Sequence, residues 1–228
     1  MKSQKITRSR PSEDKRRYDD ACGTAHGLEL VGERWALLVL RELMLGPRRF
    51  SQLRADLPGI SANVLTQRLN DLERRGLVRK GRLSPPANVS VYEATEWGLE
   101  AEAIVQSLGR WAARSPAHDP TLPISGVSIL LSIRTMIDRD KARAMNARIN
   151  FRFGNDQYRG QLRDGTLAVE RGEHPDPDLC IAADPQSLAA VLYGKAEYGL
   201  IDWSGDRDLL DRFVDLFHLP AKASVPAR

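Results

Sequence analysis

The sequence predicts an α+β protein built from two domains, and three observations support this fold class. The chain has 228 residues, which is enough for two domains of roughly 100 residues each. Helix-like hydrophobic patterns and strand-like ones occur in both halves. A segment with three prolines, SPAHDPTLPISG at 115–126, separates the halves and contains little that packs.

We expect a basic flexible arm over 1–17, a first domain over 18–116 and a second domain over 122–219. The arm carries seven Lys and Arg residues and few apolar ones, which is typical of a solvated segment. Residues 1–118 carry 20 Lys and Arg against 14 Asp and Glu, whereas residues 119–228 carry 14 against 16. This asymmetry indicates that only the first half meets a polyanion.

Several classes of protein are disfavoured by composition. No apolar run approaches the roughly 20 residues of a membrane span, so we expect a cytoplasmic protein without a membrane partner. The two cysteines, Cys22 and Cys180, lie in different halves and predict no disulfide framework. The four histidines are scattered, and no phosphate loop or nucleophile elbow occurs. We therefore expect no metal, no cofactor, no catalytic residue and no enzyme activity.

The first domain begins with helical periodicity. Apolar residues recur at intervals of three and four across 28–43, with an interruption near Gly32. A short helix follows, and its apolar positions are Phe50, Leu53 and Leu57. The next helix is expected from Ser61, its N-cap, to about residue 75, and its apolar face comprises Leu65, Leu69 and Leu72.

A hairpin and a final helix complete this domain. Gly76 suits the left-handed position that ends a helix. Strands are expected over 77–84 and 89–94, separated by a proline-containing turn. Thr95 is the expected N-cap of a long helix that ends near residue 113 and has an apolar stripe reaching Trp111.

This order of elements is that of a winged helix-turn-helix. A helix fits the major groove of B-DNA, where short polar side chains reach base edges and the amides of Asn and Gln pair with adenine. The expected base contacts are Ser61, Asn63, Thr66, Gln67 and Asn70. The expected phosphate contacts are Arg79, Lys80 and Arg82 in the hairpin, with Arg48 and Arg49 on the flanking backbone.

The same region resembles the HxlR-type regulators. The resemblance covers nearly all of residues 20–112 and rests on CGTA from Cys22, LVGERWALLVLREL, GPRRFSQL, PGISANVLTQRLNDLERRGLV and VYEATEWG. It implies a homodimeric winged-helix transcription regulator in which the terminal helices of the domain form much of the dimer contact. The stripe ending at Trp111 fits that role, and core packing against Trp35 is the alternative.

The family resemblance also raises a redox hypothesis at Cys22. Many members have Cys-Pro here, and in some of them the cysteine senses oxidants or electrophiles, whereas this chain has Gly23 after the cysteine. A thiol near a helix N-terminus with basic neighbours has a lowered pKa. Asp19 and Asp20 oppose that effect, and a free cysteine is often only a small buried apolar residue. A redox-sensing regulator is therefore an alternative.

The second domain has an apolar helix followed by a meander. The helix is expected over 127–137, and strands are expected over 148–153, 157–163, 166–170 and 179–183. Two more helices follow, one over 185–193 capped by Asp184 and one capped by Asp206.

This arrangement resembles the sterol carrier protein type-two-like fold, through RFGNDQYRG, DGTLAV, DPDLCIAADPQSL and GDRDLL. Such domains enclose an apolar cavity that suits a lipid-like molecule. The candidate wall residues are Met136, Phe151, Phe153, Tyr193, Tyr198 and Trp203, and ordinary core packing is the alternative for each of them.

The sequence thus predicts a one-component regulator that binds double-stranded DNA as a homodimer and responds to a hydrophobic small molecule. A lipid-binding or carrier protein, whose first domain serves mainly for dimerisation, is the alternative from another class.

Overall fold

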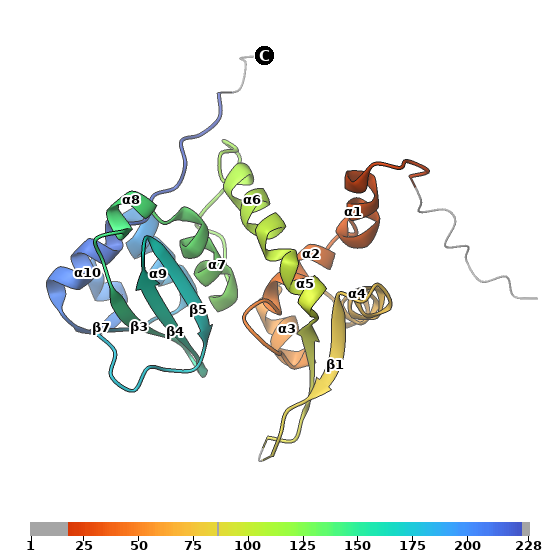
Figure 1. Ribbon diagram of the computed structural model, residues 1–228, viewed down its shortest axis with the longest axis horizontal. Helices are drawn as coiled ribbons and strands as arrows, with labels where there is room; N and C mark the ends of the chain where they lie inside the picture. Colours follow the sequence, from red (N-terminus) through yellow and green to blue (C-terminus); the bar gives the residue numbers. More distant parts are fainter. Residues whose placement is uncertain (1–17, 86, 225–228) are drawn as a thin grey trace, which may run out of the picture.

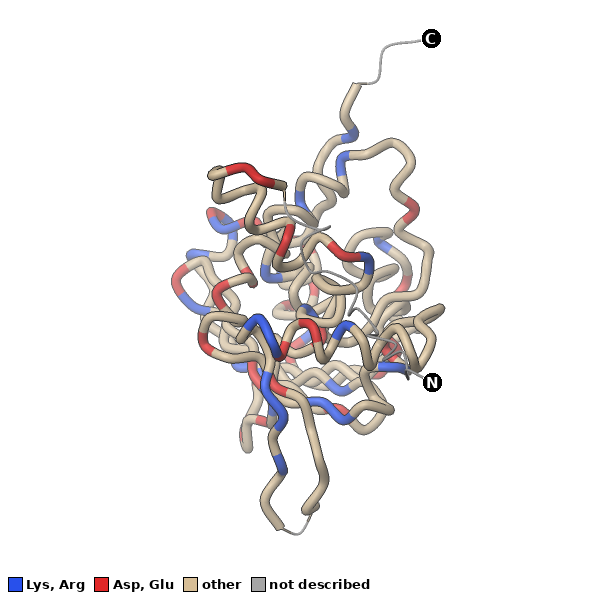
Figure 2. Tube along the Cα trace, turned by 90° about the vertical axis from the view of Figure 1, so that its right-hand side faces the viewer, with Lys and Arg blue, Asp and Glu red and all other residues tan. Residues whose placement is uncertain are grey.

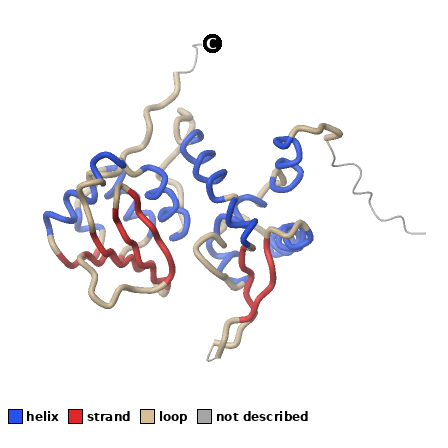
Figure 3. Tube along the Cα trace, viewed as in Figure 1, coloured by secondary structure: helices blue, strands red, loops and turns tan. Residues whose placement is uncertain are grey.

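The computed structural model describes residues 18–85 and 87–224, and the basic arm expected over 1–17 lies outside them. Two mixed helix-and-sheet units lie side by side, the first mostly helical with a hairpin and the second built on a larger sheet (Figures 1 and 3). The α+β class is therefore confirmed. None of the described helices is long and apolar enough to cross a membrane.

The first unit follows the expected order of elements. Its elements are α1(Gly23–Val31), α2(Ala36–Glu42), α3(Phe50–Asp56), α4(Ala62–Arg74), β1(Val78–Arg82), β2(Ser90–Ala94), α5(Glu96–Glu100) and α6(Glu102–Ala112). The interruption expected near Gly32 separates α1 from α2, where Trp35 has a φ of 77°. The single helix expected after Thr95 is divided into α5 and α6 at Ala101, whose φ of −68° and ψ of −6° lie in the right-handed helical region.

Local signals at both ends of α4 fix the position of this helix. The Ser61 hydroxyl accepts a hydrogen bond from the backbone N–H of Val64 at 3.3 Å, and Gly76 follows the helix with a φ of 74°. Only glycine adopts that left-handed conformation without strain. One hydrogen bond joins the two ends of the hairpin. The hydroxyl of Thr95, which follows β2, donates to the carbonyl of Gly76, which precedes β1, at 2.7 Å.

The second unit is a five-stranded sheet with helices on one face (Figure 1). Its elements are α7(Gly126–Met136), α8(Arg139–Ala142), β3(Ala147–Phe153), β4(Asp156–Arg163), β5(Thr166–Arg171), β6(Leu179–Ala182), α9(Pro185–Gly194), β7(Asp202–Gly205) and α10(Arg207–Val214). The strand order is β5-β4-β3-β6-β7, with β3 and β6 parallel. α8 and β7 are not among the elements expected from the sequence, and each is only four residues long.

The two units share one hydrophobic core and several polar contacts. α6 packs on α7, where Arg110 donates to the Thr135 carbonyl at 2.9 Å and Arg134 pairs with Glu102 at 2.9 Å. The fully buried Glu42 of α2 accepts a hydrogen bond from Ser125, the N-cap residue of α7, at 2.9 Å. Burial raises the pKa of Glu42 although the neighbouring arginine opposes this.

Candidate nucleic-acid interface

The exposed face of α4 presents a row of side-chain amides. Asn63, Gln67 and Asn70 are separated by four and three residues, so they lie on one face of the helix, and all three are exposed. None of these amides has a hydrogen-bond partner within the part of the chain that the structure describes. They are therefore available to base edges.

Ser61 and Thr66 are also exposed, but their hydroxyls already serve the helix. Ser61 caps α4, and the Thr66 hydroxyl donates to the Ala62 carbonyl at 2.9 Å. A serine or threonine hydroxyl retains acceptor capacity in such a bond, so both residues can still contact DNA through their remaining lone pairs.

The opposite face of α4 holds the helix against the domain. Leu65, Leu69 and Leu72 are completely buried there, as the sequence pattern predicts. Arg68 is also buried and pairs with Asp71 at 3.2 Å and with Glu33 at 3.4 Å. Arg68 therefore helps to hold the buried face of α4 against the rest of the domain.

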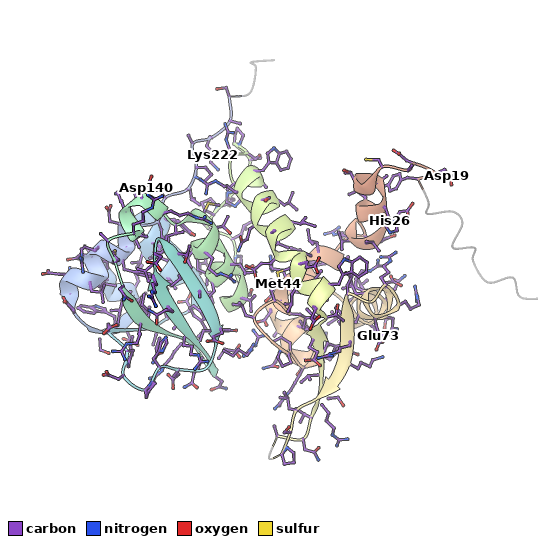
Figure 4. The ribbon with its side chains drawn as sticks, in the orientation of Figure 1. Asp19, His26, Met44, Glu73, Asp140 and Lys222 are labelled. Atoms are coloured by element: carbon purple, nitrogen blue, oxygen red, sulfur yellow. The ribbon has the colours of Figure 1, made fainter. Side chains whose placement is uncertain are left out.

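The hairpin β1–β2 forms a basic wing next to α4, and Figure 2 shows Lys and Arg gathered along one strand of it. Arg79 pairs with Glu93, and Lys80 pairs with Glu73 of α4, each at 2.8 Å (Glu73 is labelled in Figure 4). Exposed ion pairs of this kind are worth at most about 1 kcal/mol, so both cations can exchange partners with phosphate. Arg82 is exposed and has no partner among the described residues.

The structure separates the two arginines expected at the flanking DNA backbone. Arg49 is exposed at the start of α3, where it stays available to phosphate. Arg48 is only 1% exposed, and its guanidinium lies 2.9 Å from Asp56 and 2.5 Å from Asp156. The DNA contact expected for Arg48 is therefore wrong. Its guanidinium is buried in ion pairs with Asp56 of the first domain and Asp156 of the second, so it cannot reach DNA phosphate.

One further residue belongs to this surface. Arg74 is exposed, pairs with Asp71 at 2.6 Å and follows Asn70 by four residues, so it extends the amide row toward the wing. The helical spacing could have identified it in the sequence.

A second exposed face, on α6, is apolar. Ile104, Leu108 and Trp111 are 56%, 46% and 72% exposed, and they recur at intervals of four and three. The alternative of core packing between Trp111 and Trp35 is therefore wrong. Monomeric proteins rarely expose such a continuous apolar stripe.

Cys22 is exposed and occupies the N-cap position of α1. Hydrogen bonds from Thr24, and then from the backbone of Ala25, lower the pKa of this thiol. Cys180 lies on β6 in the other domain, and both cysteines are free.

The six residues expected to line an apolar cavity pack in different places. Phe151 is buried with its ring centroid 6.2 Å from that of Phe213, and the Tyr193 hydroxyl lies 2.7 Å from that of Ser132. Tyr198 and Trp203 both lie beneath the Arg207 guanidinium. Met136 and Phe153 are buried. These contacts favour the alternative of core packing for most of the set.

Metal-binding chemistry finds no support in the described residues, where no group of three or more His, Cys, Asp and Glu side chains could hold an ion.

The exposed amide row, the basic wing and the anchored helix define a winged helix-turn-helix DNA-binding protein. Residues 30–119 match the HxlR-like helix-turn-helix family, and residues 121–223 match the family described as alkyl sulfatase C-terminal. The chain belongs to the HxlR-like helix-turn-helix family and is a DNA-binding transcriptional regulator.

Two relatives from Bacillus subtilis (strain 168) illustrate the family. The chain is 35% identical over 83 residues to the HTH-type transcriptional regulator YodB, covering 36% of this chain and 74% of YodB. It is 40% identical over 92 residues to the HTH-type transcriptional regulator YkvN, covering 40% of this chain and 77% of YkvN.

Solved structures match each half separately. The reduced form of YodB from B. subtilis covers 44% of this chain and 100% of its own, at 30% identity and a TM-score of 0.39. The inverting sec-alkylsulfatase Pisa1 from Pseudomonas sp. covers 45% of this chain at 21% identity and a TM-score of 0.37, and only 17% of Pisa1 is matched.

Proposed function

We propose that this regulator binds an inverted-repeat operator as a homodimer and that its second domain makes the binding responsive to a small molecule. The observation that carries the DNA part is the row of unpartnered amides at Asn63, Gln67 and Asn70, beside the basic wing. Two-fold symmetry places the half-sites about one helical turn, or a multiple of it, apart.

The dimer proposal rests on the apolar stripe of α6. One side of α6 packs on α7, so Ile104, Leu108 and Trp111 have no cover within the described chain. A second copy of the same stripe is the self-complementary partner that a two-fold dimer requires.

The effector proposal rests on the contacts between the two domains. An effector changes DNA affinity only if it binds the DNA-competent and incompetent states differently. Glu42 and Arg48 connect the second domain to α2, α3 and the wing, so a ligand-induced change in the second domain has a physical route to α4. The sequence of the second domain resembles the sterol carrier protein type-two-like fold. This resemblance favours a hydrophobic molecule as the effector.

A redox response at Cys22 is the second candidate function. The exposure of the thiol and its lowered pKa favour it, and YodB has been solved both reduced and bound to a quinone. If Cys22 senses electrophiles, a quinone will change operator affinity in the wild type and leave a Cys22→Ser variant unchanged.

The decisive experiment selects bound sequences from random duplex DNA and then measures their affinities by gel shift. A Gln67→Ala, Asn70→Ala variant should lose operator preference, because each bidentate base contact contributes roughly 1–3 kcal/mol of discrimination. The matched control is Gln157→Ala, an exposed amide in the second domain. Unchanged sequence selectivity in the double variant would contradict the proposal.

A further inference from the structure

A cavity of about 840 Å³ lies where the two domains meet. From the first domain it is lined by Ala55, Asp56 and Pro58, at the end of α3 and the turn that leads to α4. The remaining walls come from the start of α7, the β3–β4 turn, the β6–α9 junction and residues 199–202. A molecule bound here would therefore touch both domains at once.

The polar part of this cavity is predominantly acidic. Four carboxylates line it, those of Asp56, Asp156, Asp184 and Asp202. The one cationic side chain in the lining is that of Arg152, and it is already paired with Glu173. Asp202 is exposed and has no hydrogen-bond or ion-pair partner among the described residues, so its carboxylate is available to a ligand.

The N-termini of two helices also reach the cavity, and such sites often bind anions. Here each of them already has a side-chain cap. The Ser125 hydroxyl accepts from the Ser128 N–H at 3.0 Å, and Asp184 accepts from the N–H groups of Gln186 and Ser187 at 3.0 and 2.9 Å. Arg48 and Arg171 already hold the carboxylates of Asp56 and Asp156, whereas that of Asp202 has no partner among the described residues. An anion would therefore meet satisfied helix ends and the unpaired carboxylate of Asp202, so the chemistry favours a cation.

The remaining walls are apolar. Ile124, Phe153, Leu200 and Ile201 contribute them. An inorganic cation would leave this surface in contact with water, whereas an organic cation would cover it. Ligand sites of this size combine apolar walls with a few convergent polar groups.

We propose that the interdomain cavity binds a small organic cation, a protonated amine that carries an apolar group. Its ammonium group pairs with Asp202 and with the carboxylates at the Asp56–Asp156 end, and its apolar group lies against Phe153 and Leu200. The regulatory meaning of this site rests on the function proposed above, whereas the binding itself does not.

The site lies next to groups that contact α3 and the wing, so a bound ligand can affect both of these elements. Asp56 is the last residue of α3, and Asp156 begins β4; the Arg48 guanidinium holds both. The Arg48 backbone in turn exchanges hydrogen bonds with Tyr92 of the wing, at 2.9 and 2.8 Å. A cation that competes with Arg48 for these carboxylates therefore acts on α3 and on the wing together. Linkage requires that DNA then alters the affinity for the cation by the same factor.

The test is isothermal titration calorimetry on the full chain with probes that differ in charge. The amines are 2-phenylethylamine, tryptamine and hexylamine; 2-phenylethanol is the neutral probe and 3-phenylpropionate the anionic one. We expect at least one amine to bind and the alcohol and the carboxylate not to. Asp202→Asn should weaken amine binding about tenfold, as expected for loss of a charged hydrogen-bond partner. Asp202→Lys should abolish amine binding.

The matched control is Asp140→Asn on α8, which removes an exposed carboxylate outside the cavity (Figure 4) and should leave amine affinity unchanged. Because Asp202 is exposed, its variants should retain the wild-type circular dichroism spectrum and melting temperature. The proposal is overturned if no amine binds, if the carboxylate binds as tightly as the amines, or if Asp202→Asn leaves amine affinity unchanged.

Operator binding without any probe is measured in parallel. A chain that selects an operator but binds no amine contradicts the cavity assignment alone. A chain that binds the amines with no sequence-selective DNA binding supports the cavity assignment and contradicts the proposed function.

Discussion

The guanidinium Nη1 of Arg48 lies 2.5 Å from Oδ2 of Asp156, although the two residues are 108 positions apart and belong to different domains. Arg171 holds the other oxygen of the same carboxylate at 3.0 Å, and Asp56 lies 2.9 Å from the second amino group of Arg48. Burial alone raises the pKa of Asp156, but hydrogen bonds from Arg48 and Arg171 outweigh it and lower the pKa overall. One buried side chain thus ties the sheet of the second domain to the wing.

Removing the Arg48 charge should destabilise the protein strongly. An Arg48→Met variant leaves Asp56 and Asp156 partly buried and facing each other without their shared cation. The loss of one partner of a buried ion pair costs about 3 kcal/mol or more, measured as the free energy of unfolding in urea at pH 7. Arg54→Met, on the exposed side of α3, is the control and should change stability by less than about 0.5 kcal/mol.

Neutralising the carboxylates should restore part of that loss. Adding Asp56→Asn and Asp156→Asn to Arg48→Met removes the two carboxylates that have lost Arg48. Arg171 then loses its ion pair with Asp156 but is partly exposed to solvent, so the triple variant should still be more stable than Arg48→Met alone. Additive destabilisation by all three substitutions would show that the cluster contributes through packing and not through charge.

Tyr158 should make the protein sensitive to alkaline pH. Burial raises the pKa of this phenol from 10.0 to about 12, although the charges of Arg171 and Arg48 oppose the shift. The unfolded chain therefore loses the proton near pH 10, whereas the folded chain retains it up to about pH 12. The stabilisation is complete below pH 10 and is lost as the pH rises toward 12, by about 2–3 kcal/mol in total.

Urea unfolding between pH 8 and pH 11 measures this effect. Tyr158→Phe has no such proton, so its stability should fall less steeply with pH than that of the wild type. Tyr18→Phe, at an exposed tyrosine, should leave the slope unchanged. Parallel curves for wild type and Tyr158→Phe would refute the assignment.

The sequence predicts the DNA-reading elements well because their signals are local. Ser61 and Gly76 mark the two ends of α4, and the spacing of Leu65 and Leu69 marks its buried face. The partner of Arg48 has no such signal, because Asp156 is brought near only by the tertiary fold. From the sequence alone, an arginine before a helix-turn-helix is therefore interpreted as a phosphate contact. Only the structure shows that the second domain supplies its partner.

The same reasoning explains the errors in the second domain. The periodicity of Phe151 identifies a strand with one apolar face, but it does not distinguish a cavity wall from a core position. The strand β7 is only four residues long and lacks a long alternating pattern, so its pairing with β6 follows from tertiary contacts. Asp202 lies on that strand and lines the interdomain cavity, and no motif in the sequence predicts this position.

Arg82 should contribute to DNA affinity without contributing to sequence selectivity. It is exposed on the wing and faces the phosphate backbone in the proposed complex. Arg82→Ala should weaken binding to specific and random duplexes alike, and the slope of log K against log salt should decrease in magnitude by about one unit at most. Arg163→Ala, at an exposed arginine in the second domain, is the control. A loss confined to the selected operator would instead assign Arg82 to base recognition.

Trp111 should control the oligomeric state through the α6 stripe. Its side chain is 72% exposed, so Trp111→Glu should fold normally, with an unchanged melting temperature measured at a concentration where the protein is monomeric. Central aromatic residues of an interface often contribute about 2 kcal/mol or more, so the dimer dissociation constant from sedimentation equilibrium should rise about 30-fold or more. Leu122→Glu, at an exposed apolar residue of the linker, is the matched control and should leave the constant unchanged.

A monomeric variant should still bind a half-site weakly but lose the cooperative binding of the full operator, because each winged helix then acts alone. Retention of the dimer by Trp111→Glu would place the interface elsewhere and remove the role proposed for the α6 stripe.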